Sequence, residues 1–141
     1  MATERETQAP TDRVLCGLVK VLANQIEANI RARAAALGLT ASQGTALCEL
    51  TRPMTLRELA ERMGCEPSNA TFVADRLEEQ GYLERHPHPD DRRAKQLVLT
   101  PKGTELRERL LELLSENSPL APLAPEERDV LRQLLTRALI R

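Results

Sequence analysis

Apolar residues recur every three or four positions along several segments of the chain, and this spacing predicts amphipathic helices. The first segment runs from Asp12 to Leu37, and Gly38 follows it as a left-handed stop. Its apolar positions are Leu15, Leu18, Val19, Leu22, Ile26 and Ile30. We therefore expect a long first helix. Residues 1–10 before it are polar and are expected to form a short disordered tail.

Two capping boxes open the next two helices. Thr40 with Gln43 begins a helix that continues to Leu50, and Thr55 with Glu58 begins another. In such a box the threonine side chain accepts a backbone N–H three residues ahead, and the Gln or Glu side chain returns a bond to the threonine N–H. Two short, separately capped helices are predicted.

A fourth helix and a hairpin complete the middle of the chain. Pro67 suits the first turn of the helix and Gly81 suits its end. Its inward face is predicted to consist of Ala70, Val73, Ala74 and Leu77. Residues 82–85 and 95–99 then alternate in polarity around a charged connection rich in proline, which predicts two paired strands with their tip in water.

Two further helices follow, one capped by Thr100 and beginning at Pro101, and one beginning at Pro125. The apolar positions of these helices are Leu106, Leu110, Leu113 and Leu114, then Val130, Leu131, Leu134, Leu135 and Ala138. Such stripes must be buried. A symmetric dimer is the simplest solution, and packing on the same chain is the alternative.

The order of helices, hairpin and helices is that of a winged helix-turn-helix. The fold class is mostly α with a small β-hairpin wing, and one Phe, one Tyr and no Trp agree with a core of aliphatic side chains. We predict a single domain over residues 1–141. The winged helix-turn-helix occupies 40–100, and the N- and C-terminal dimerisation helices occupy 11–38 and 101–141.

The outer face of the fourth helix is the first candidate site. At 100° per residue, small polar groups and one aromatic project away from its inward face: Ser68, Asn69, Thr71, Phe72, Asp75 and Arg76. Asn can read adenine, Ser and Thr can bond bases or phosphates, Phe can touch a thymine methyl, and Arg can reach guanine or phosphate. The face therefore fits a DNA major groove, and an ordinary solvated face is the alternative.

The hairpin is the second candidate site. The formal net charge of −1 gives no overall basic surplus, so a DNA-binding face would need local segregation of charge. Basic residues do gather around the hairpin: Arg85, Arg92, Arg93 and Lys95. Arg93 is expected to enter a minor groove, and Asp91 is expected to hold a neighbouring arginine in position. A solvated charged turn is the other interpretation.

Three stretches carry a family resemblance: residues 63–71, Asp75-Arg76-Leu77-Glu78 with Gly81-Tyr82-Leu83-Glu84-Arg85, and Asp91-Arg92-Arg93 with residues 97–103. Together they resemble the multiple antibiotic resistance regulator (MarR) family. The resemblance implies a homodimeric DNA-binding transcription factor, commonly a repressor. Its partners would be a second copy and a pseudo-palindromic duplex with half-sites about 10 base pairs apart.

Two kinds of trigger are compatible with this resemblance. We expect release from DNA by a small-molecule effector bound between the winged unit and the dimerisation helices. Oxidation of Cys16 is the alternative, because Arg13 and Lys20 lie near it on one side of the first helix and the family includes members with a reactive cysteine there. Cys48 and Cys65 are interpreted as helix-packing residues, and a helical protein-interaction module without DNA binding is a further alternative.

Other classes of protein find little support in the sequence. It has no glycine-rich phosphate loop and no nucleophile with a plausible base, so we expect neither an enzyme nor a cofactor. His86 and His88 lack a third ligand at suitable spacing, which argues against a metal site. Three widely spaced cysteines and the lack of a long apolar run indicate a cytoplasmic protein with no membrane span.

Overall fold

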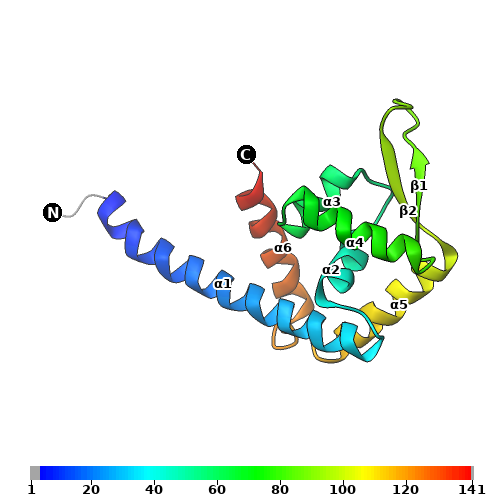
Figure 1. Cartoon of the computed structure of the whole chain (residues 1–141). Helices are drawn as coiled ribbons and strands as arrows, with labels where there is room; N and C mark the ends of the chain where they lie inside the picture. The colour runs from blue at the N-terminus through cyan, green and yellow to red at the C-terminus, as the bar shows by residue number, and fades with distance from the viewer. Residues whose placement is uncertain (1–3, 141) are drawn as a thin grey trace. The chain divides into compact units, whose positions relative to one another are not determined.

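In the computed structural model, which describes residues 4–140, the chain forms six helices and one two-stranded hairpin. The elements, labelled as in Figure 1, are α1 (Glu4–Ala36), α2 (Ala41–Glu49), α3 (Leu56–Met63), α4 (Pro67–Glu79), β1 (Leu83–Pro87), β2 (Lys95–Leu99), α5 (Pro101–Glu116) and α6 (Pro125–Leu139). The predicted class, mostly α with a small β-hairpin, is confirmed. No helix within residues 4–140 combines the length and the apolar character needed to cross a membrane.

The described chain divides into two compact units. One, which we call the winged unit, is Glu27–Glu116, and the terminal unit comprises the residues before and after it. The sequence placed all of 101–141 among the dimerisation helices. In the structure α5 belongs to the winged unit, because Leu106 and Leu110 are buried in the core of that unit.

The first helix is longer than predicted. It begins at Glu4 and includes Pro10, whereas the sequence suggested a disordered tail over 1–10; residues 1–3 lie outside the described residues. A proline inside a helix removes one backbone hydrogen bond without preventing the turns on either side of it. The polar composition of this segment therefore misled the prediction, because polarity by itself does not oppose helix formation.

Both predicted capping boxes are present. The Thr40 side chain accepts the Gln43 N–H at 3.1 Å, and Gln43 Oε1 accepts the Thr40 N–H at 2.9 Å. Thr55 and Glu58 make the equivalent pair at the start of α3. At the start of α6 only half of such a box exists: Glu127 accepts the Ala124 N–H, but alanine has no side-chain acceptor to return the bond.

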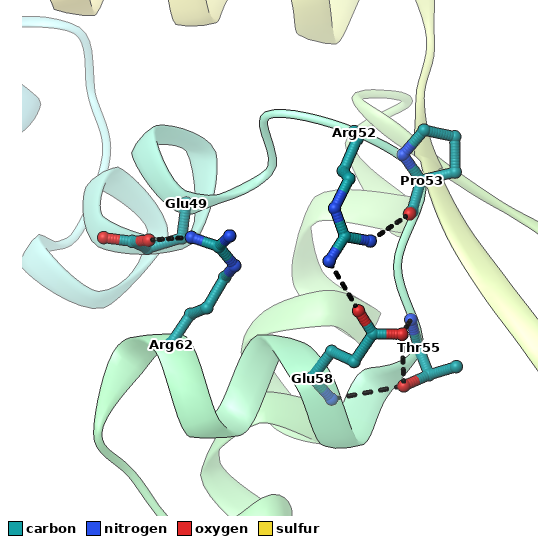
Figure 2. A network of polar contacts seen from close by, with 6 residues as sticks. All are labelled: Glu49, Arg52, Pro53, Thr55, Glu58 and Arg62. Atoms are coloured by element: carbon teal, nitrogen blue, oxygen red, sulfur yellow. Dashed lines mark hydrogen bonds and ion pairs between the residues drawn. The ribbon is translucent and has the colours of Figure 1, made fainter. Parts of the chain in front are cut away.

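Ion pairs extend the second capping box, as Figure 2 shows. Arg52 donates to Glu58 Oε2 at 2.9 Å and to the Pro53 carbonyl, while Arg62 of α3 lies 3.5 Å from Glu49 of α2. The hydrogen bond from Arg52 is the main reason why the pKa of Glu58 is lowered, with the Thr55 N–H contributing next. The acid therefore stays ionised as it caps α3.

The core of the winged unit is built from aliphatic side chains of every element in that unit. Its largest fully buried residues are Leu47, Met54, Leu59, Leu77, Leu83, Leu97 and Leu110. The half-buried Arg107 of α5 bonds to α2: its Nε donates to the Leu47 carbonyl at 2.9 Å. The core thus holds all the elements from α2 through α5 in place, and these elements carry the two candidate sites.

The strands are antiparallel, and Leu83 pairs with Leu99 at one end and Pro87 with Lys95 at the other. Figure 1 shows them as a narrow hairpin projecting beyond the helices of this unit, and we call it the wing. The first strand begins one residue later than predicted, because the Tyr82 N–H bonds to the Leu77 carbonyl and so closes the end of α4. It also runs to Pro87, whose missing N–H is tolerated on an edge strand.

The base of the wing is tied to the start of α5. The Thr100 hydroxyl donates to the Gly81 carbonyl at 2.7 Å and accepts the Gly103 N–H at 3.0 Å. A side chain at Gly103 would collide with the Tyr82 carbonyl, so only glycine allows this close approach. The Thr-Pro-Lys-Gly stretch therefore fixes where the wing leaves the helical core.

Candidate nucleic-acid interface

The helix α4 has the two faces that the sequence predicted. Its inward face is confirmed: Ala70, Val73, Ala74 and Leu77 are buried. On the other side Ser68, Asn69, Phe72 and Arg76 are exposed, and Thr71 is half-buried. Five of the nine predicted DNA-binding residues thus lie together on one surface of the winged unit, which we call the α4 face.

An aromatic ring and a cation make a cation–π contact on this face. The Phe72 side chain is 62% exposed, and the Arg76 guanidinium lies 5.4 Å from the centre of its ring. The two residues were predicted as separate DNA contacts, and their contact with each other was not predicted. Their i, i+4 spacing was the available signal, since residues at this spacing are neighbours on a helix surface.

Thr71 is less available than expected as a hydrogen-bond donor. Its hydroxyl donates to the Pro67 carbonyl one turn earlier, at 2.9 Å. The oxygen can still accept a bond, but a contact to a phosphate oxygen would require the hydroxyl to give up this partner. Among the small polar residues of α4, Ser68 and Asn69 are more exposed.

The other four predicted residues, Asp91, Arg92, Arg93 and Lys95, are exposed at or near the tip of the wing. Asp91 does hold a neighbouring arginine, but through the main chain: its Oδ1 accepts the Arg93 backbone N–H at 3.0 Å. Its carboxylate makes no ion pair with the side chains described at residues 10–140. Asp91 therefore shapes the turn, and its carboxylate does not pair with the guanidinium group of Arg92 or Arg93.

The wing and α4 are joined by Arg85 of β1. Its guanidinium donates to Asp75 at 2.6 Å and to Glu78 at 2.8 Å, both on α4. These bonds raise the pKa of Arg85, the hydrogen bond to Asp75 most of all. The sequence analysis counted Arg85 with the basic residues of the wing. The structure shows instead that its charge is used to neutralise two acids beside the α4 face.

The two histidines of the wing have local partners. His86 Nε2 lies 2.9 Å from Glu84 Oε2, and His88 Nδ1 accepts the Asp90 N–H at 3.0 Å, which places any proton of neutral His88 on Nε2. In the part of the chain that the structure describes, no three His, Cys, Asp or Glu side chains are grouped as a metal site requires.

All three cysteines fall within the described residues, and all are free thiols. Cys16 is exposed on α1. Cys48 packs partly against the core, and burial raises the pKa of its thiol despite the opposing influence of Arg107. Cys65 was expected to pack between helices, but it is half-buried and lines a cavity.

That cavity, of about 510 Å³, lies beside the α4 face and was not foreseen from the sequence. Asn69, Phe72 and Arg76 form part of its wall, and the rest comes from Val73 and Gln80, the start of α2 and the end of α3. One wall is fixed by a hydrogen bond from Gln43 to Gln80, at 2.9 Å, that ties the start of α2 to the end of α4. No local sequence pattern predicts such a cavity, because its walls come from separate helices.

Comparison with known proteins identifies relatives of this chain. The model of the MarR family matches residues 39–95. The uncharacterised HTH-type transcriptional regulator YkoM of Bacillus subtilis is 33% identical over 61% of this chain and 57% of its own. The transcriptional repressor MprA of Escherichia coli is 35% identical over 60% of this chain and 49% of its own. The chain thus spans about half the length of these two relatives.

Solved structures show the same fold. A MarR-family regulator from Silicibacter pomeroyi superposes with a TM-score of 0.75 at 25% identity, covering 88% of each chain. The apo form of MarR from Escherichia coli gives a TM-score of 0.69 at 25% identity, over 89% of this chain and 96% of its own. A mutant of that protein in complex with operator DNA gives a TM-score of 0.67 at 24% identity, over 99% of this chain and 100% of its own.

One relative matches over most of its length. The uncharacterised HTH-type transcriptional regulator YcgE of Bacillus subtilis is 30% identical over 81% of this chain and 75% of its own. The family model covers the helix-turn-helix and most of the wing, the two elements that carry the candidate sites. The chain belongs to the MarR family.

Proposed function

We propose that the protein is a homodimeric, sequence-specific DNA-binding transcriptional regulator that acts as a repressor. The observation that carries this proposal is the α4 face: a helix surface rich in hydrogen-bonding groups beside a wing with arginines at its tip. A helix of this kind fits the major groove while the wing reaches the adjacent minor groove. The names of the relatives support the same function.

The local distribution of charge favours a nucleic acid despite the net charge of −1. Arg92, Arg93 and Lys95 carry exposed positive charge on the wing, and Arg85 offsets the charge of Asp75 and Glu78. Phosphate binding depends on the charges that face the duplex rather than on the sum over the chain. This distribution favours DNA over the alternative of a protein-interaction module.

A second copy of the chain is the proposed partner of the terminal helices. Large apolar side chains are exposed on α1, namely Val14, Leu15, Leu18, Val19 and Val21, and others on and beside α6, namely Val130, Leu134, Leu135, Leu139 and Ile140. Monomeric soluble proteins seldom expose apolar surface on this scale. A symmetric dimer would cover it and would present two α4 faces to a pseudo-palindromic duplex.

For the trigger, we propose a small-molecule effector, with oxidation of Cys16 as the second candidate. The cavity beside the α4 face supports the first, although at another place than the sequence suggested, because all its lining residues belong to the winged unit. An occupant would contact Phe72 and Arg76, which are also proposed to bind DNA. The exposed thiol of Cys16 supports the second. An effector shifts the protein away from DNA only by as much as it binds the DNA-free form more tightly.

The first test is titration of the protein with duplex DNA from upstream of its own gene, at two salt concentrations. We expect tight binding that weakens steeply with salt, because phosphate contacts release counterions. Arg93→Ala should weaken binding by about 1 to 3 kcal/mol through lost minor-groove and phosphate contacts. Arg109→Ala, which removes the same charge from an exposed position of α5, is the control and should bind like the unmodified protein. Salt-independent binding, or equal losses in both variants, would contradict the proposal.

The dimer is tested by placing a charge on the apolar face of α6. Leu134→Asp, at a position 53% exposed, should produce a monomer in analytical ultracentrifugation at micromolar concentration and should abolish binding to a two-half-site duplex. Gln133→Asp adds the same charge at an exposed polar position of α6 and should leave the dimer intact. A monomeric unmodified protein, or a Leu134→Asp variant that remains a dimer, would refute the assignment.

The Cys16→Ser variant decides between the two triggers. If a small molecule is the trigger, peroxide should affect the DNA complexes of the variant and of the unmodified protein equally, in a gel-shift assay. A variant complex that resists peroxide while the unmodified complex dissociates would establish oxidation instead and would reverse our ranking.

A further inference from the structure

Phe72 is an unusual residue to leave in water. It is the one Phe of the chain, yet its side chain is 62% exposed, and it lies on the side of α4 opposite the four buried residues. An aromatic side chain of this size usually contributes to a core, and a large one left exposed indicates a binding surface. The buried core does not include it, so its position is explained better by what it could contact outside the protein.

Its ring supports Arg76. The guanidinium lies 5.4 Å from the ring centre, a cation–π distance, so a long and flexible side chain is held against a rigid surface. A guanidinium above a ring uses no N–H hydrogen to make this contact, so its N–H groups remain able to donate hydrogen bonds. Phe72 therefore presents Arg76 as well as its own ring to any partner of α4.

The surrounding charges leave Arg76 available. The acid next to it in the sequence, Asp75, is paired with Arg85 at 2.6 Å. Among the side chains of residues 10–140, Arg76 makes no ion pair of its own. The guanidinium is thus held in place by the ring and not by an acid that a DNA base would have to displace.

The chemistry of the pair matches two neighbouring bases. An arginine edge bonds guanine O6 and N7 in the major groove, and an apolar side chain packs on the thymine methyl group. Successive bases on a strand are about 3.4 Å apart along the axis and are also displaced sideways by the helical twist. Groups that lie 5.4 Å apart on the protein therefore fit adjacent base pairs.

We propose that Phe72 and Arg76 form a single reading element that selects a thymine next to a guanine in each half-site. Phe72 reads the thymine methyl group and also positions Arg76 for guanine, so the two preferences depend on each other. This inference rests on the proposed function, because it specifies which bases the α4 face recognises. It predicts a dinucleotide preference rather than two independent single-base preferences.

The test begins with selection of duplexes from a random library by the full-length protein. Each retained half-site should contain the thymine–guanine step. Replacing that thymine by deoxyuridine removes only the methyl group and should weaken binding about fourfold, the effect of one buried apolar carbon. Replacing the guanine by 7-deazaguanine removes one acceptor and should weaken binding by at least about fivefold.

Two variants then separate the two roles of the ring. The Phe72→Ala protein should bind the duplex with deoxyuridine as tightly as the duplex with thymine. The loss of affinity caused by 7-deazaguanine should also be smaller for this variant, because Arg76 is no longer supported by the ring. Phe72→Leu keeps an apolar contact without the ring, so it should retain sensitivity to the methyl group while losing most of its preference for guanine. Position 72 is exposed, so the thermal melting of both variants should match that of the unmodified protein.

The outcomes distinguish this inference from the function on which it rests. A library from which no duplex is retained would overturn both. Retained duplexes that lack the thymine–guanine step, or that bind equally well when deoxyuridine replaces the thymine, would overturn the inference alone. Both of these measurements use the unmodified protein. A Phe72→Leu protein with unchanged preference for guanine would show that the ring does not position Arg76.

Discussion

The seating of the wing on the helical core is the constraint on which the rest of the winged unit depends. Met54, in the link between α2 and α3, forms an isolated bridge with Leu97 of β2, and the Leu97 N–H donates to the Met54 carbonyl at 2.7 Å. Both side chains are buried, as is Leu83 of β1. The hairpin is therefore attached to the core by main-chain bonds on one side and by apolar contacts on its inner face.

This seating determines where Arg85 points. Side chains alternate between the two faces of a strand, so Arg85 shares a face with the buried Leu83, two residues earlier. It is also the cross-strand partner of Leu97. The side chain is thus directed toward α4, where it meets Asp75 and Glu78. A surface ion pair contributes only about 0 to 1 kcal/mol, so these contacts bias the position of the wing against α4 and do not hold the fold together. They also offset negative charge beside the proposed DNA-binding face.

Much of this structure could be predicted from the sequence because its signals are local. The capping boxes of Thr40 and Thr55, Pro67 at the start of α4, and the apolar spacing of that helix each act within one or two turns, and all are confirmed. What the sequence did not reveal depends on contacts between elements. The pairing of Arg85 with α4 needs the register of the wing, and the cavity beside Phe72 needs the packing of α2 and α3 against α4.

The central claim is that the α4 face and the wing act as one DNA-binding surface, coupled through the contacts of Arg85 with α4. A double-mutant cycle on DNA affinity, with Arg85→Gln, Arg93→Ala and the double variant, tests this claim most directly. If Arg85 holds the wing in place, Arg93→Ala should cost less in the Arg85→Gln background, with a coupling energy of at least about 0.5 kcal/mol. Losses that simply add, in variants with unchanged thermal stability, would contradict the claim.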